Sequence, residues 1–208
     1  GWSDADFDFS REHNVDCLVC HDQSGQYVKG LSGVVPADVD LLASAKSVGR
    51  PTRDNCGYCH FNGGGGDAVK HGDLDETMVH PQEQVDVHMA RHDFACQDCH
   101  RTEKHAIAGR SMSVSVDAAA RVSCRDCHSA TPHRSERLDA HTDALACQSC
   151  HVPKMAVAAP TKTSWDWSTA GQDREEDPHE YLKIKGSFTY AEDLAPEYQW
   201  YDGRADRY

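Results

Sequence analysis

CQDCH at residues 96–100, CRDCH at 124–128 and CQSCH at 147–151 repeat one five-residue pattern along a single stretch of the chain. Two further copies lie upstream, CLVCH at 17–21 and CGYCH at 56–60. Two thiols three positions apart can form thioethers with the two vinyl groups of one porphyrin, and the adjacent histidine can then bind the iron. The repeats therefore predict five covalently attached haem c groups.

These motifs account for every cysteine of the chain. We expect the thioether bonds to form at Cys17, Cys20, Cys56, Cys59, Cys96, Cys99, Cys124, Cys127, Cys147 and Cys150. The histidine that follows each second cysteine is the expected iron ligand of its site, namely His21, His60, His100, His128 and His151.

Other uses of paired cysteines fit the pattern less well. A structural zinc site draws its four ligands from two such pairs, so five pairs would leave one unmatched. Zinc also gives no reason for a histidine after every second cysteine. A thioredoxin-like motif is normally single and lies in a βαβ context, which is absent here. Disulfides within five two-residue loops would join nothing distant in the chain.

The composition favours a polypeptide that wraps its cofactors. Hydrophobic residues make up 38% of the 208 positions, and the mean hydropathy is −0.69, which is low for an ordinary apolar core. Porphyrins would supply much of the missing apolar interior. We therefore predict a mostly irregular chain with short α-helices and little β-structure, wrapped around a haem array.

Charge and hydropathy also limit the partners. The formal net charge of −13 argues against binding to nucleic acid or to an anionic membrane surface. No apolar run approaches the ~20 residues that span a bilayer. Thioether haem attachment takes place outside the cytoplasmic membrane, so we expect a periplasmic or extracellular location. The chain reads as a mature form or a piece of one, because it starts with Gly1 rather than methionine.

Two regions differ in composition. Residues 1–151 hold all five motifs, whereas residues 152–208 lack cysteine and are rich in tryptophan and tyrosine. We expect the second region to be a tail that packs on the haem core or on a partner.

A few regular elements are predicted between the motifs. A helix should begin near Pro36 and Asp38 and end before Gly49. Asp117 and Thr142 are expected to cap two further helices that lead into the fourth and fifth motifs. Residues 182–185 alternate as a strand does, and Gly186 is expected to turn the chain toward Phe188 and Tyr190.

The remaining histidines are numerous enough to complete the iron coordination. Nine lie outside the motifs, against only four methionines, so two histidines per iron is the favoured arrangement. It implies low reduction potentials and electron transfer rather than ligand binding. We expect the second ligands to be His105, His133 and His141, which lie between closely spaced motifs, with His71 and His88, whose neighbours Asp73 and Asp86 could orient their rings.

Several stretches resemble one family, the octahaem cytochromes typified by octahaem tetrathionate reductase. They cover nearly the whole chain: GW at 1–2, DFDF at 6–9, DCLVCHD at 16–22, CGYCHF at 56–61, GGGGDAVKHGDL at 63–74, DVHM at 86–89, WDWSTAG at 165–171 and KGSF at 185–188. The family carries eight haem sites, so the resemblance implies that these five represent a central region. It also implies that Lys70, in the KHGD stretch, is the lysine that binds the active-site iron of a haem attached elsewhere.

Three functions are compatible with this reading. The first is electron transfer through five mainly bis-histidine haems, between redox partner proteins or identical subunits. The second is a part of a multihaem oxidoreductase that reduces tetrathionate, nitrite or hydroxylamine, whose active-site haem lies outside this chain. The third is a subunit of a homo-oligomer or an extracellular conductive filament.

Overall fold

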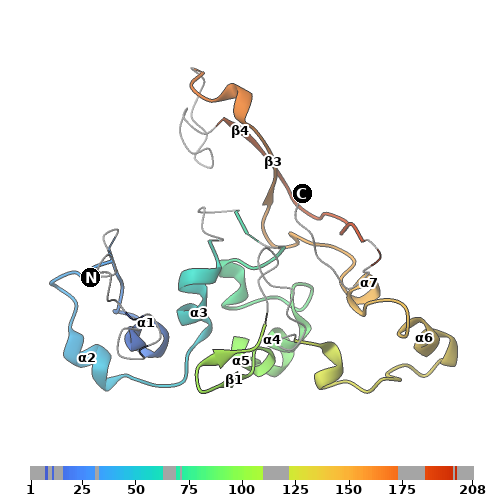
Figure 1. The fold of residues 1–208 in the computed structure, drawn as a ribbon, viewed down its shortest axis with the longest axis horizontal. Helices are drawn as coiled ribbons and strands as arrows, with labels where there is room; N and C mark the ends of the chain where they lie inside the picture. Colours follow the sequence, from blue (N-terminus) through green and yellow to red (C-terminus); the bar gives the residue numbers. More distant parts are fainter. Residues whose placement is uncertain are drawn as a thin grey trace. The chain divides into compact units, whose positions relative to one another are not determined.

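Short helices separated by irregular chain dominate the computed structural model, which confirms the predicted fold class (Figure 1). The structure describes residues 8, 11, 16–30, 33–62, 69–70, 72–109, 122–172, 186–198 and 200. The chain divides into two compact units, Gly1–His60 and Phe61–Tyr208, and each is described by itself. The predicted division into residues 1–151 and 152–208 stays a prediction.

The elements are brief throughout. The helices are α1 Cys17–His21, α2 Leu41–Lys46, α3 Arg53–His60, α4 Val87–His92, α5 Cys96–Cys99, α6 Glu136–His141 and α7 Gln148–His151. The 3-10 turns include η2 Glu76–Met78, η4 Cys124–Asp126 and η5 Trp167–Thr169. The strands are β1 Thr102–Glu103, β2 Ala106–Ile107, β3 Thr161–Asp166 and β4 Ser187–Ala191.

In the first unit, aspartates fix the starts of two helices. Asp16 accepts a hydrogen bond from the Leu18 amide at 3.2 Å and caps α1. Asp40 accepts from the amides of Leu42 and Ala43 at 3.0 and 2.9 Å and caps α2. The expected helix is therefore present, but it begins after Asp40 rather than near Pro36, because the Asp40 carboxylate is the one that reaches the first free amides.

Asp22, directly after the first motif, is the hydrogen-bonding centre of this unit. Only 4% of the residue is exposed. Its carboxylate accepts from the hydroxyls of Ser24 and Ser47 at 2.6 and 2.9 Å and from the Gly25 amide at 3.0 Å. Burial on its own would raise the pKa of Asp22, but these hydrogen bonds lower it to about 2. The carboxylate thus ties the chain after α1 to the end of α2.

Replacing Asp22 with alanine should loosen this connection. The buried donors would lose their acceptor, at a cost of about 1–3 kcal/mol. We expect the Gly49 amide, which bonds to the His21 carbonyl at 3.0 Å, to exchange its hydrogen about tenfold faster or more in the haem-loaded protein. Asp38→Ala, at an exposed position, is the control and should leave that rate unchanged. Equal rates in the two variants would contradict this role of Asp22.

In the second unit, side-chain caps again set the helix limits. Asp86 caps α4 by accepting from the Met89 amide at 2.9 Å. Thr142 does not begin a helix, as the sequence suggested. It ends α6, where its amide and hydroxyl both donate to the Asp139 carbonyl, at 3.0 and 2.7 Å. The helix expected after Asp117 starts within residues 110–121, outside the described residues.

The tail forms an antiparallel hairpin of β3 and β4, which run side by side in Figure 1. Gly186 has φ of +74°, and a Cβ there would lie 2.2 Å from the Asp166 carbonyl oxygen, so only glycine fits. Phe188 and Tyr190 lie in β4 as expected, but their partner strand β3 was not predicted. The strand expected at residues 182–185 lies outside the described residues.

The tail is also tied to earlier segments of its unit. The Asp73 carboxylate accepts hydrogen bonds from the amides of Ala156 and Val157 at 2.9 and 2.6 Å. The Tyr198 hydroxyl lies 2.9 Å from the Gln148 carbonyl oxygen and 3.0 Å from that of Val152. The tail segment therefore packs next to α7, which carries the fifth motif.

The polypeptide buries little apolar surface of its own. Within the described part of the chain, Phe61 and Ala156 are the buried hydrophobic residues, while Leu42 and Val34 are 63% and 66% exposed. In the ranges that the structure covers, no helix has the length and apolar character needed to cross a membrane. So small an apolar core is expected of a chain whose interior is filled by cofactors.

Candidate haem-binding sites

Each motif folds as a short helical turn. The histidine amide bonds to the carbonyl of the first cysteine in three of them, His100 to Cys96, His128 to Cys124 and His151 to Cys147, at 2.8, 2.9 and 3.0 Å. Residues three apart lie on the same side of such a turn, so both thiols can face one porphyrin. All ten cysteines lie in the described residues, and none of them is in a disulfide.

Two motif histidines are held in the tautomer that iron needs. His21 Nδ1 lies 2.8 Å from the Gly49 carbonyl oxygen, and His100 Nδ1 lies 2.8 Å from that of Ala108. A carbonyl oxygen only accepts, so Nδ1 carries the proton and Nε2 keeps its lone pair for a metal. The residues present therefore fit the group that the motifs predict.

Consecutive motifs lie near one another within each unit. Burial raises the pKa of the Cys20 thiol, and the nearby Cys59 thiol raises it further. Burial likewise raises the pKa of Cys124, with the thiol of Cys147 adding to the shift. A thiol affects the pKa of another only at short range, so neighbouring attachment sites are close in space. Such closeness is a requirement for electron exchange between them.

Two predicted second ligands lie close to motif histidines. The ring centroids of His88 and His128 are 6.0 Å apart with an interplanar angle of 64°. Those of His133 and His151 are also 6.0 Å apart, with an angle of 11°. A metal–imidazole bond of about 2 Å, plus the distance from nitrogen to ring centre, places two rings on opposite sides of one metal roughly 6 Å apart. Both pairs have the spacing of axial ligands.

The other predicted second ligands are His105, His141 and His71. His105 lies in the turn between β1 and β2, where Lys104 and His105 have φ of 48° and 67°. His141 is the last residue of α6 and is exposed. His71 lies outside the described residues. Their ligand roles stay predictions.

Lys70 is buried in an ion pair. Its side chain is 1% exposed, and the amine bonds to the Asp75 carboxylate and to the Ala159 carbonyl oxygen, the latter at 2.8 Å. Burial favours a raised pKa for Asp75, but the hydrogen bonds from Lys70 and Thr77 hold it below its usual value. To bind an iron, the amine would have to leave Asp75, so the role as a metal ligand stays a prediction.

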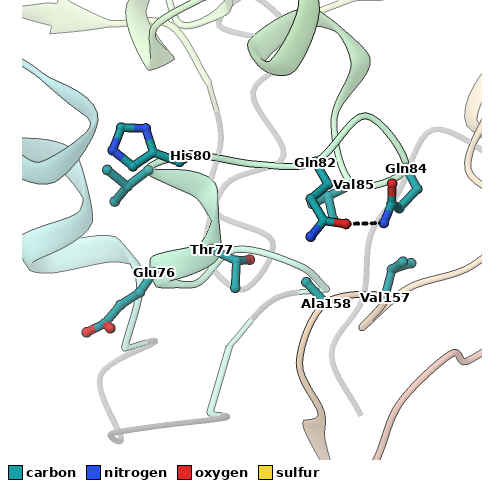
Figure 2. A pocket seen from close by; sticks show the side chains of 9 residues that line it. Glu76, Thr77, His80, Gln82, Gln84, Val85, Val157 and Ala158 are labelled. Atoms are coloured by element: carbon teal, nitrogen blue, oxygen red, sulfur yellow. Dashed lines mark hydrogen bonds between the residues drawn. The ribbon is translucent and has the colours of Figure 1, made fainter.

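A cavity of about 420 Å³ is lined in part by residues that follow Lys70 closely in the sequence (Figure 2). Glu76, Thr77 and His80 line one part of it, and Val157 and Ala158 line another. None of its described lining residues belongs to a motif, so the cavity is separate from the attachment cysteines.

The structure adds one partner that the sequence did not suggest. His133 Nδ1 lies 3.0 Å from Asp139 Oδ1. Of the two aspartates expected to orient histidines, Asp86 does not reach its ring, while the pairing of Asp73 with His71 lies outside the described residues. Asp86 Oδ1 is 3.8 Å from His88 Nδ1, too far for a hydrogen bond, and Asp73 binds the amides of the tail. The only sequence signal for Asp139 is a carboxylate on the helix after His133.

Comparison with known proteins agrees with these sites. The chain superposes on the crystal structure of an octahaem cytochrome c from Shewanella oneidensis with a TM-score of 0.83 and 46% identity, over 98% of this chain. The expected resemblance to octahaem cytochromes is thereby confirmed. This chain spans 47% of the length of that cytochrome.

Two sequence matches are shorter. A family model described as bacterial cytochrome c matches residues 162–208, the part without cysteine. An uncharacterized protein of Archaeoglobus fulgidus is 31% identical over 118 residues, which are 48% of this chain and 39% of that protein. These matches, the five attachment motifs and the likeness to a solved cytochrome lead to one conclusion. The chain belongs to the multihaem c-type cytochromes.

Proposed function

We propose that this chain transfers electrons through five covalently bound haem c groups, most of them held between two histidines. The observation that carries the proposal is the 6.0 Å spacing of His88 with His128 and of His133 with His151. An iron with two histidine ligands keeps no position for a substrate, and it exchanges single electrons at low potential. This arrangement favours transfer over substrate reduction at these two sites.

The chain's own residues set the conditions for that transfer. Five pairs of cysteines fix the positions of the groups, and within each unit neighbouring attachment sites lie close together. The carbonyls of Gly49 and Ala108 orient His21 and His100. Bound haem supplies one-electron chemistry, while the polypeptide supplies spacing, ligands and exposure.

The acidic surface and the attachment chemistry suggest where the protein works. We infer a periplasmic or extracellular location, with redox proteins or identical subunits as partners. Because this chain spans under half of the similar octahaem cytochrome, any reductase activity would belong to a longer protein.

Haem counting tests the proposal directly. A pyridine haemochrome assay and the intact mass should both give five haems per chain, and carbon monoxide should leave the visible spectrum unchanged. A Cys147→Ser/Cys150→Ser variant is the matched control and should carry four. Fewer than five haems in the unaltered chain would contradict the count. A stoichiometric carbon monoxide shift would reveal an open iron and favour the reductase interpretation instead.

A further inference from the structure

Asp139 makes two hydrogen bonds to a single residue. Its Oδ1 lies 2.9 Å from the His133 amide nitrogen and 3.0 Å from His133 Nδ1. The side chains of His133 and Asp139 are only 27% and 16% exposed. A carboxylate oxygen accepts, so the ring proton lies on Nδ1 and the lone pair on Nε2. The carboxylate thus holds both the backbone and the ring of this histidine.

We propose that Asp139 lowers the reduction potential of the haem attached at Cys147 and Cys150. This inference rests on the proposed function, in which His133 and His151 are the two axial ligands of that iron. A histidine that binds a metal through Nε2 and donates its Nδ1–H to a carboxylate is a more basic ligand. More electron density at the iron stabilises the ferric state relative to the ferrous state. Reduction adds one electron from an external reductant, and the Nδ1 proton stays between His133 and Asp139 in both states.

The neighbouring site supplies an internal comparison. His88 faces His128 with the same 6.0 Å spacing, but Asp86 Oδ1 is 3.8 Å from His88 Nδ1 and accepts from the Met89 amide instead. The His88 and Asp86 side chains are also more exposed, at 47% and 30%. A carboxylate therefore strengthens one of the two ligand pairs and not the other. Electrons should pass from the site of Cys147 and Cys150 toward that of Cys124 and Cys127.

The ring angles make the two sites distinguishable by electron paramagnetic resonance. When both imidazole planes are parallel, they donate to the same iron d orbital and separate it in energy from its partner. Crossed planes act on the two orbitals about equally. The pair at 11° should therefore give a rhombic low-spin ferric signal, and the pair at 64° should give a signal with one large g value.

The test is a redox titration of the full haem-loaded chain, poised with dithionite and followed by these signals. In Asp139→Asn the amide oxygen still accepts both hydrogen bonds, but the charge is gone. We expect the ferric-to-ferrous ratio of the rhombic component to fall about tenfold at fixed potential, a positive shift of about 59 mV for one electron. Asp86→Asn is the matched control, because asparagine also caps a helix, and both components should then stay in place.

Different failures have different meanings. In Asp139→Asn the ferric-to-ferrous ratio of the rhombic component at fixed potential could instead change by less than about twofold, with both signals retained. That result would overturn the role of Asp139 and leave the proposed function intact. The rhombic component of this site is the one that His133→Ala removes. If His133→Ala lost none of the rhombic low-spin intensity, the ligand assignment itself would be wrong. The unaltered protein gives a second measurement that needs no variant. There, the rhombic component must titrate at a lower potential than the component with one large g value, and the reverse order would overturn the inference.

Discussion

Made without its haems, the chain should be unfolded, with no cooperative thermal transition and with the far-ultraviolet circular dichroism of a disordered polypeptide. In the described part, Phe61 and Ala156 are the buried apolar residues, and Leu41, Leu42 and Val48 are all more than half exposed. The conformational entropy of ordering costs about 1–2 kcal/mol per residue, and so small an apolar core does not offset it. Five porphyrins would supply the missing apolar surface.

The measurement compares two preparations of the same chain. One is made in cells that attach haem, and the other is made without that machinery, with the cysteines kept reduced. The loaded chain should melt cooperatively and the haem-free chain should not. A cooperative transition with native-like circular dichroism in haem-free material would show that the polypeptide folds independently of its cofactors.

Replacing either facing histidine should open one iron per chain. His133→Ala removes the ring opposite His151, and His88→Ala removes the ring opposite His128. An iron with a single histidine keeps a free position that carbon monoxide can occupy. We expect carbon monoxide binding to rise from none to one haem in five in each variant, and to two haems in the double variant.

His80→Ala is the control for these variants, since His80 lines the cavity beside η2. Carbon monoxide titration of the dithionite-reduced proteins, followed by absorbance, gives the number of open irons. The loss of one electron paramagnetic resonance component identifies which site has opened. A His88→Ala or His133→Ala protein that binds no carbon monoxide would show that the second ligand comes from another residue.

The sequence alone predicted the attachment thiols, the histidine ligand of each motif and the fold class. The spacing within each motif predicts which thiols and which histidine serve one group, because all three lie within a single helical turn. The low hydropathy predicts a mostly irregular chain, since short apolar stretches cannot build long buried elements. The helix α2 was predicted as well, although its start at Asp40 depended on which carboxylate reached the first amides.

The tertiary structure decided which distant residues meet. The sequence offered nine histidines outside the motifs but no period that pairs them with an iron, and only the folded path brings His88 to His128 and His133 to His151. The same holds for Asp139, and for Lys70, whose buried amine bonds to the carbonyl of Ala159 as well as to Asp75. Thr142 ends one helix rather than starting another, because its hydroxyl reaches the carbonyl of Asp139 behind it. A motif closes within a few bonds of backbone, whereas these contacts depend on the course of long irregular segments, which residue spacing does not determine.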